Sequence, residues 1–135
     1  MFLGEFQHTL DAKQRLAIPN ELRKCWRKDQ HGESMVAAPG ENGALWLWPE
    51  KTFHKLAGDL GTSLRQERGM SDFQRRLFSQ SASVSIDGAG RIRIPDRMLT
   101  KHGLSGEVVV IGAGEHMELH STHGWALELE RLAGA

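Results

Sequence analysis

The sequence of 135 residues has one cysteine, Cys25, so no disulfide can form within the chain. This excludes the disulfide-rich secreted class and predicts a reducing compartment. No apolar run approaches the roughly 18 residues that a membrane-spanning helix requires, and Glu5 interrupts the first residues before they could form a signal peptide. We therefore expect a soluble, cytoplasmic protein that contacts no membrane.

The chain also lacks net charge, because 17 Lys and Arg residues balance 17 Asp and Glu residues. That balance excludes a uniformly basic protein, so any binding to nucleic acid must use a local patch. Residues 1–28 hold six basic residues against three acidic ones, whereas residues 104–135 hold one arginine and five glutamates. A basic front and an acidic tail can orient an anionic partner toward one face.

Patterns typical of enzymes and metal sites are also missing. The glycines of 112–114 lack the third glycine and the following helix of a dinucleotide site, and Cys25 has no nearby histidine and acid to activate it. His116, His120 and His123 are spaced like metal ligands. The first two, however, fall on a predicted strand with about 13 Å between their Cα atoms. We predict no metal, no cofactor, no small-molecule substrate and no catalytic residue.

What the sequence does contain is a motif that occurs twice. HTLDAKQRLAIP (8–19) and SVSIDGAGRIRIP (83–95) both place an Asp four residues before an Arg and end in Ile-Pro, at a constant offset of 76 residues. The similarity continues downstream through further strand-like runs. Internal repetition of this kind indicates two copies of one structural unit. We predict two half-domains at 1–60 and 78–135, joined by a helical connector at 61–77.

The spacing of apolar residues predicts the elements of each half. Alternation over 5–10 and 16–18 predicts two strands around a tight turn, and the second motif repeats this pattern. The proline that ends each motif suits the first turn of a helix, which predicts helices at 19–28 and 95–103. A helix is also expected over 71–80. Further strands are expected at MVAAP, ALWLW, EVVVIG and HMELH, with a final helix in each half. The predicted fold class is α+β and β-rich.

The arginine of each motif has two interpretations. In the first, the pairs Asp11–Arg15 and Asp87–Arg91 only brace their turns. An exposed ion pair contributes roughly 0–1 kcal/mol, which is a weak reason to use both residues twice. In the second, the Asp orients an Arg whose guanidinium faces a phosphate or the edge of a guanine.

The first copy has the more basic surroundings. Lys13 lies in its turn, and Arg23 and Lys24 follow the motif, whereas the second turn is the neutral Gly-Ala-Gly. If only one copy binds nucleic acid, the first is the better candidate.

Subunit contacts are predicted from two apolar segments. Trp46 and Trp48 alternate with leucines, so their strand has one face for the core and one for a neighbouring subunit, with base stacking as the less favoured role. Phe2 and Leu3 are expected to be exposed at the amino terminus. Both features predict a homo-oligomer.

The segments MFLGEFQHTLDAKQRLAIPNELR and SIDGAGRIRIP resemble the MraZ family of bacterial transcriptional regulators, within the SpoVT/AbrB superfamily, and the resemblance covers nearly the whole chain. It implies two pseudo-symmetric, swapped-hairpin halves that form one double-split barrel. It also implies a ring-shaped homo-oligomer that binds double-stranded promoter DNA of the cell-division and cell-wall gene cluster, in the nucleoid. Asp11 and Arg15 fall on the first family motif, Asp87 and Arg91 on the second. Gln14 stands where the family often has glycine.

Two functions from different classes fit these observations. The leading one is a non-enzymatic, sequence-specific DNA-binding regulator that acts as a ring on direct repeats, since head-to-tail contacts make neighbouring subunits face DNA in the same sense. Its expected DNA-binding residues are Arg15, Lys13, Asp11, Arg23 and Lys24, with Asp87 and Arg91 as the second copy. The alternative is an oligomeric protein-interaction module whose Asp–Arg turns are structural.

Overall fold

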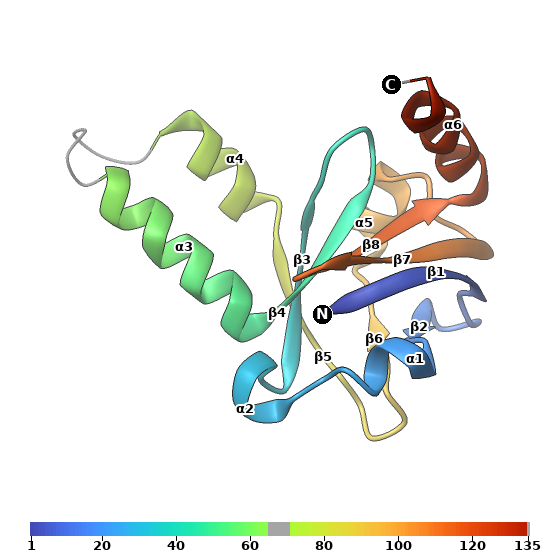
Figure 1. Cartoon of the computed structure of the whole chain (residues 1–135), viewed down its shortest axis with the longest axis horizontal. Coiled ribbons are helices and arrows are strands. Elements are labelled where there is room, and N and C mark those ends of the chain that lie inside the picture. Colours follow the sequence, from blue (N-terminus) through green and yellow to red (C-terminus); the bar gives the residue numbers. More distant parts are fainter. Residues whose placement is uncertain (65–70, 135) are drawn as a thin grey trace.

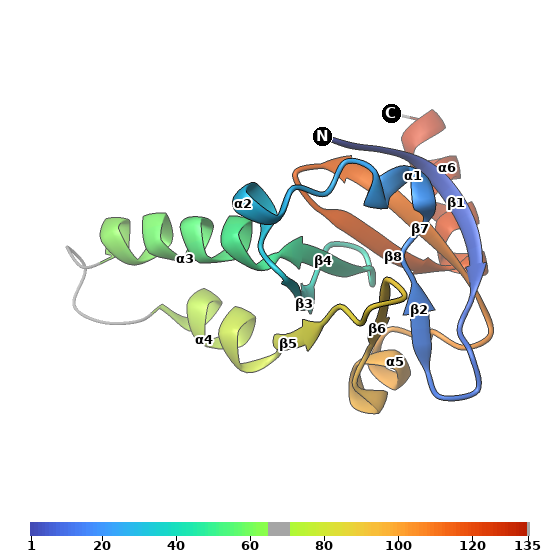
Figure 2. The same ribbon diagram turned by 90° about the horizontal axis from the view of Figure 1, so that it is seen from below.

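The computed structural model describes residues 1–64 and 71–134, so residues 65–70 of the predicted connector lie outside the described residues. Its largest feature is an antiparallel sheet, drawn in Figure 1. In spatial order its six strands are β1 (Phe2–Thr9), β7 (Glu107–Gly114), β8 (Met117–Ser121), β4 (Leu45–Pro49), β3 (Ser34–Pro39) and β5 (Ala82–Ser85). Two short strands, β2 (Arg15–Ala17) and β6 (Arg91–Arg93), pair with each other as a separate ribbon. Figure 2 shows this ribbon apart from the main sheet.

Helices surround the sheet. They are α1 (Asn20–Arg23), α2 (Lys28–His31), α3 (Glu50–Leu64), α4 (Asp72–Ser79), α5 (Asp96–Lys101) and α6 (Thr122–Ala133). In Figure 1, α3 and α4 project from one end of the molecule, and α6 lies at the other. Within the described residues, no helix combines the length and apolar character needed to cross a membrane.

The two halves of the chain contribute to the sheet symmetrically. The order of the strands stays the same when each strand of the first half is replaced by its counterpart in the second half, and the reverse. β1 pairs with β7 and β5 pairs with β3, while β4 meets β8 at the centre and β2 meets β6 in the ribbon. Each motif is a strand, a turn and a strand, as the sequence predicts. The strands that flank a turn nevertheless pair with the opposite half rather than with each other. The boundaries of the half-domains at 1–60 and 78–135 stay a prediction.

The main sheet is open rather than closed into a barrel, so the expected double-split barrel is not confirmed. β1 and β5 are its free edges, and the ribbon forms a second sheet of its own. The turns explain the separation: β1 ends at Thr9 and β2 begins only at Arg15, so the chain leaves the sheet before the ribbon starts. Next to the second turn, a single bridge joins Ile86 to Ile92. The α+β class is confirmed, with a large antiparallel sheet, whereas the β-rich character is not, because the helices hold slightly more of the described residues than the strands.

The core lies between the sheet and the ribbon. Leu16 of β2 and Ile92 of β6 are fully buried and belong to one apolar cluster with Leu45, Leu47 and other sheet residues. Burying a leucine or isoleucine side chain stabilises a fold by about 1.5–3 kcal/mol. A two-stranded ribbon is marginally stable by itself, so this burial fixes the ribbon to the sheet.

The prediction of a helix over 19–28 is wrong beyond Arg23, where α1 ends. Trp26 interrupts it: the indole packs against His31 with 5.1 Å between ring centroids, and its N–H donates to the carbonyl of Gly32 at 2.8 Å. The helices predicted at 95–103 and 71–80 are confirmed as α5 and α4.

The amino terminus also differs from its prediction. Phe2 packs against Trp26 and His31 and is only 1% exposed, so the expectation that it is exposed is wrong. Leu3, on the opposite face of β1, is 65% exposed, as predicted. Strand alternation explains why neighbouring residues have opposite environments.

Candidate nucleic-acid interface

The two motif turns have the same backbone geometry. In the first, the N–H of Gln14 donates to the carbonyl of Asp11 at 3.0 Å; in the second, the N–H of Gly90 donates to the carbonyl of Asp87 at 2.9 Å. Gln14 and Gly90 both adopt positive φ, 61° and 76°. Such a turn is closed by a residue in the left-handed conformation, which glycine adopts at no steric cost. Gln14 thus takes the backbone form of the glycine that the family often has there.

One carboxylate organises each turn. Oδ1 of Asp11 accepts hydrogen bonds from the backbone N–H groups of Lys13 and Arg15, both at 2.9 Å. Oδ2 accepts from Nε of Arg15 at 2.7 Å. The backbone N–H of Arg15 is the main reason why the pKa of Asp11 is lowered. The carboxylate therefore stays ionised. It holds the backbone of the turn through Oδ1 and the Nε atom of the guanidinium through Oδ2.

The second turn repeats these contacts. Oδ1 of Asp87 accepts from the N–H groups of Ala89 and Arg91, and Oδ2 accepts from Nε of Arg91, all at 2.9 Å. The pKa of Asp87 is lowered, again chiefly by the backbone N–H of the arginine. The bracing that the first interpretation requires is present in both copies.

Bracing leaves the far end of each arginine available. Within the described part of the chain, only Nε of Arg15 and of Arg91 has a side-chain partner, and the terminal nitrogens Nη1 and Nη2 have none. These side chains are 28% and 37% exposed. Two parallel N–H donors on a planar group match a phosphate or the O6 and N7 atoms of guanine. The arrangement can therefore hold an anion or a guanine edge.

The ribbon brings the two copies together. In the pairing of β2 with β6, Arg15 lies opposite Arg93, and Ala17 lies opposite Arg91. Side chains two residues apart, and those directly paired, share one face of a sheet. Arg15, Arg91 and Arg93 therefore lie on one face, which we call the arginine face. The other face carries the buried Leu16.

Arg93 is a residue that the sequence interpretation missed. The available signal was the alternation in RIRIP, where Arg91 and Arg93 are two apart and flank a buried isoleucine. Alternation indicates that both arginines point away from the core. That Arg15 joins them depends on the register between strands 76 residues apart, which the local sequence does not reveal.

The sequence analysis groups Arg23 with the first motif turn, but its side chain contacts the second turn. Its Nη1 donates to the carbonyl of Ala89 at 3.3 Å, in the second turn. A Cβ on Gly90 would lie 2.3 Å from Cζ of Arg23, so the guanidinium rests on the bare backbone of that glycine. The swapped pairing explains this, because α1 of the first half lies beside the turn of the second. Lys13 and Lys24 are both exposed, the first in its own turn and the second at the end of α1.

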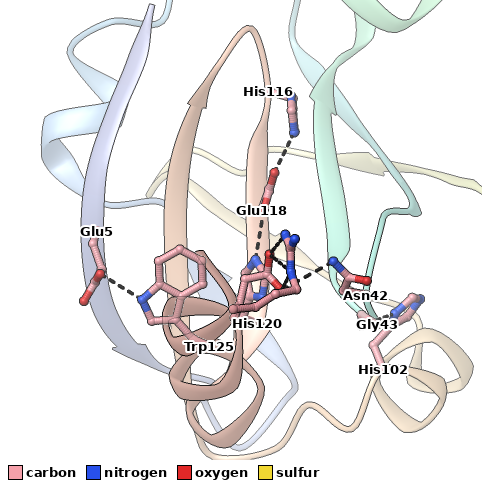
Figure 3. A network of polar contacts seen from close by, with 10 residues as sticks. Glu5, Asn42, Gly43, His102, His116, Glu118, His120 and Trp125 are labelled. Carbon is pink, nitrogen blue, oxygen red and sulfur yellow. Dashed lines mark hydrogen bonds and ion pairs between the residues drawn. The ribbon is translucent and has the colours of Figure 1, made fainter. Parts of the chain in front are cut away.

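A second polar cluster lies on the outer face of the main sheet (Figure 3). Glu118 lies between His116 and His120, whose Nε2 atoms are 3.1 and 2.9 Å from its carboxylate oxygens. These two hydrogen bonds lower the pKa of Glu118 to about 2. The ring of His116 packs against Trp46 and Trp48, at 4.3 and 4.5 Å between centroids. Among the described residues, no group of three histidine, cysteine or acidic side chains is arranged to hold a metal ion.

Comparison with known proteins gives a consistent result. The model of a family described as "MraZ protein, putative antitoxin-like" matches residues 1–72 and 77–133. The chain is similar to a protein of Heliobacterium modesticaldum, with 34% identity over 98% of this chain and 90% of the relative. It is also similar to proteins of Mycoplasmoides gallisepticum (37%, over 88% and 80%) and Thermomicrobium roseum (32%, over 98% and 90%). All three relatives are named "Transcriptional regulator MraZ".

Proposed function

The chain belongs to the MraZ family, and on that premise we propose that it is a sequence-specific, DNA-binding transcriptional regulator that contacts DNA through its arginine face. The observation that carries the proposal is the register of the ribbon, which gathers the exposed Arg93 and the partly exposed Arg15 and Arg91 on one face. The major groove of B-DNA is wide enough for a two-stranded ribbon, and arginine is the commonest partner of guanine there.

The rigidity of the turns supports the same role. An arginine held at Nε loses less conformational freedom on binding than one free to rotate, so more of the contact energy appears as affinity. Asp11 and Asp87 are part of this proposed site as residues that position the arginines. Lys13 and Lys24 are exposed cations that suit phosphate contacts. Arg23 has a positioning role at the second turn.

We further propose that the protein acts as a ring of identical subunits. The support is an incompletely packed surface at α6, which has no buried residue along its length and leaves Leu129 and Leu132 45% and 50% exposed. A helix of 12 residues is marginal in water unless one face packs against something. Near the opposite end, Phe53 and Phe73 line an apolar groove of about 330 Å³ between α3, α4 and β4. Two different surfaces at two ends suit head-to-tail contacts, which form a ring when the rotation between neighbouring subunits closes.

The arrangement of DNA sites that we expect follows from the head-to-tail ring. Subunits related by head-to-tail contacts face DNA in the same sense, so direct repeats fit better than inverted half-sites. The family resemblance suggests promoter repeats of the cell-division and cell-wall gene cluster, and hence a non-enzymatic protein of the cytoplasm and nucleoid.

The alternative function is an oligomeric protein-interaction module, and the bracing contacts in both turns favour it. Binding to DNA separates the two functions. Fluorescence anisotropy should show tight binding to the promoter duplex and weak binding to a scrambled duplex. A surface that makes 6–10 phosphate contacts should lose roughly 10³–10⁵ in affinity between about 50 and 200 mM salt. Equal affinity for both duplexes, or no dependence on salt, would support the interaction module.

A further inference from the structure

The arginine face carries more positive charge than its carboxylates balance. Asp11 pairs with Arg15 and Asp87 pairs with Arg91, whereas no ion pair or hydrogen bond engages the side chain of Arg93 among the residues that the structure describes. Arg93 also lies directly opposite Arg15 across the ribbon. Like charges that face each other on neighbouring strands are destabilising. A polyanion bound to this face removes that repulsion.

Arg93 also breaks the symmetry of the ribbon. At the offset of the repeat, Arg91 corresponds to Arg15, but Arg93 corresponds to Ala17. The arginine face has four positions, and three of them hold arginine. Without Arg93, the face would present the same side chains after a half-turn about its centre. With Arg93, its two ends differ.

The spacing on the face suits base pairs. Arg91 and Arg93 are two residues apart on β6, which at about 3.3 Å per residue puts their Cα atoms about 7 Å apart. Two steps along one DNA strand span almost the same distance, at about 3.4 Å each. Neighbouring arginines can therefore address different base pairs of one short element.

We propose that Arg93 is a specificity-determining residue that contacts a base edge in the major groove and gives each subunit a reading direction along the DNA. The proposal rests on the proposed DNA-binding function. A symmetric face would read an element equally well in either direction. The additional arginine at one end makes one direction better, which is the property that direct repeats require.

The test compares Arg93→Ala with the matched control Arg97→Ala. Arg97 is an exposed arginine on α5, outside the ribbon, so its removal changes the net charge equally. Each variant, as the full chain, is titrated by fluorescence anisotropy with two duplexes, one carrying direct repeats and one with the second repeat inverted. Wild type and Arg97→Ala should prefer the direct repeats by about tenfold or more, the effect of one arginine–guanine contact. Arg93→Ala should bind both duplexes alike.

Arg93→Lys separates a base contact from a phosphate contact. Lysine keeps the charge but loses the two-pronged geometry, so this variant should retain the salt dependence and lose the orientation preference. The inference is overturned if Arg93→Ala keeps the preference shown by Arg97→Ala, or if Arg93→Lys keeps it in full. If wild type shows no specific binding to either duplex, the proposed function itself fails, which is a different outcome from loss of the preference alone.

Discussion

The Nε atom of each motif arginine makes the bracing contact with the aspartate. Replacing the arginine by alanine removes this contact together with any contact to DNA. Measurements of stability and of DNA affinity then distinguish the two roles. The sequence favours Arg15 over Arg91 because of its basic neighbours, but Arg23 lies at the second turn, and both arginines have the same contacts. We therefore expect Arg15→Ala and Arg91→Ala to weaken specific DNA binding to a comparable degree. Each should lose about 1–3 kcal/mol of discrimination per contact, repeated in every engaged subunit.

The thermal stability of the two variants provides the control for this prediction. The Asp87–Arg91 pair is exposed and the Asp11–Arg15 pair is about one-third exposed, so the melting temperature of each variant should stay close to that of wild type. A variant that unfolds, with unchanged DNA affinity per folded molecule, would show that the pairs serve the turns alone.

Gly90 closes the second motif turn in a backbone conformation that favours glycine. Its φ of 76° is strained for any side chain, and a Cβ would collide with Arg23. We expect Gly90→Ala to lower the free energy of unfolding by about 1–2 kcal/mol, measured by urea titration. Gly88 in the same turn has open space where a Cβ would lie and no positive φ, so Gly88→Ala is the matched control. Equal stability of the two variants would contradict the cost that we assign to a side chain at the positive φ of Gly90.

At the scale of elements, β8 depends on an ionised Glu118. Its pKa is lowered from 4.5 to about 2 by hydrogen bonds from His116 and His120. A folded-state pKa below the unfolded value means that the unfolded chain binds the proton more readily, so this stabilisation is complete above pH 4.5 and is lost as the pH falls toward 2.

Glu118→Gln removes this titration. The urea midpoint of wild type should fall more steeply between pH 4.5 and pH 2 than that of the variant, while the other carboxylates contribute equally to both. Parallel curves would exclude Glu118 as the source.

The elements themselves could be predicted where the signal is local. Alternating apolar residues located the strands, and Pro19 and Pro95 located the helix starts, because both signals act within a few residues. The predicted helix over 19–28 was wrong beyond Arg23, where Trp26 packs against Phe2, a residue distant in the sequence. The partners of each strand were beyond local reach for the same reason: β1 pairs with β7, about a hundred residues away. The positions of Arg23 and Arg93 in the site follow from that pairing.

At the scale of the whole molecule, the exposed face of α6 predicts self-association. Size-exclusion chromatography with light scattering should give several times the 15.1 kDa mass of the chain. Introducing charge at the apolar contact with Leu129→Glu and Leu132→Glu should lower that mass, whereas Thr100→Glu on the exposed side of α5 should not. A monomeric wild type at micromolar concentration would contradict the ring.

The ring also predicts how repeats must be spaced. An insertion of about half a helical turn, roughly 5 base pairs, rotates one repeat to the far side of the duplex. Binding should then fall to the level of a single repeat, and an insertion of about 10 base pairs should restore part of it. Affinity that ignores spacing would show that repeats are not engaged together.

The most direct measurement asks which surface touches the DNA. Ala17 is exposed and lies opposite Arg91 on the arginine face, whereas Ala126 is exposed on α6. A diazirine-bearing side chain placed at either position reports, on illumination, whether DNA lies within a few ångströms. We expect a covalent protein–DNA adduct from position 17 with the promoter duplex, and none from position 126. An adduct from position 126 without one from position 17 would contradict the role of the ribbon.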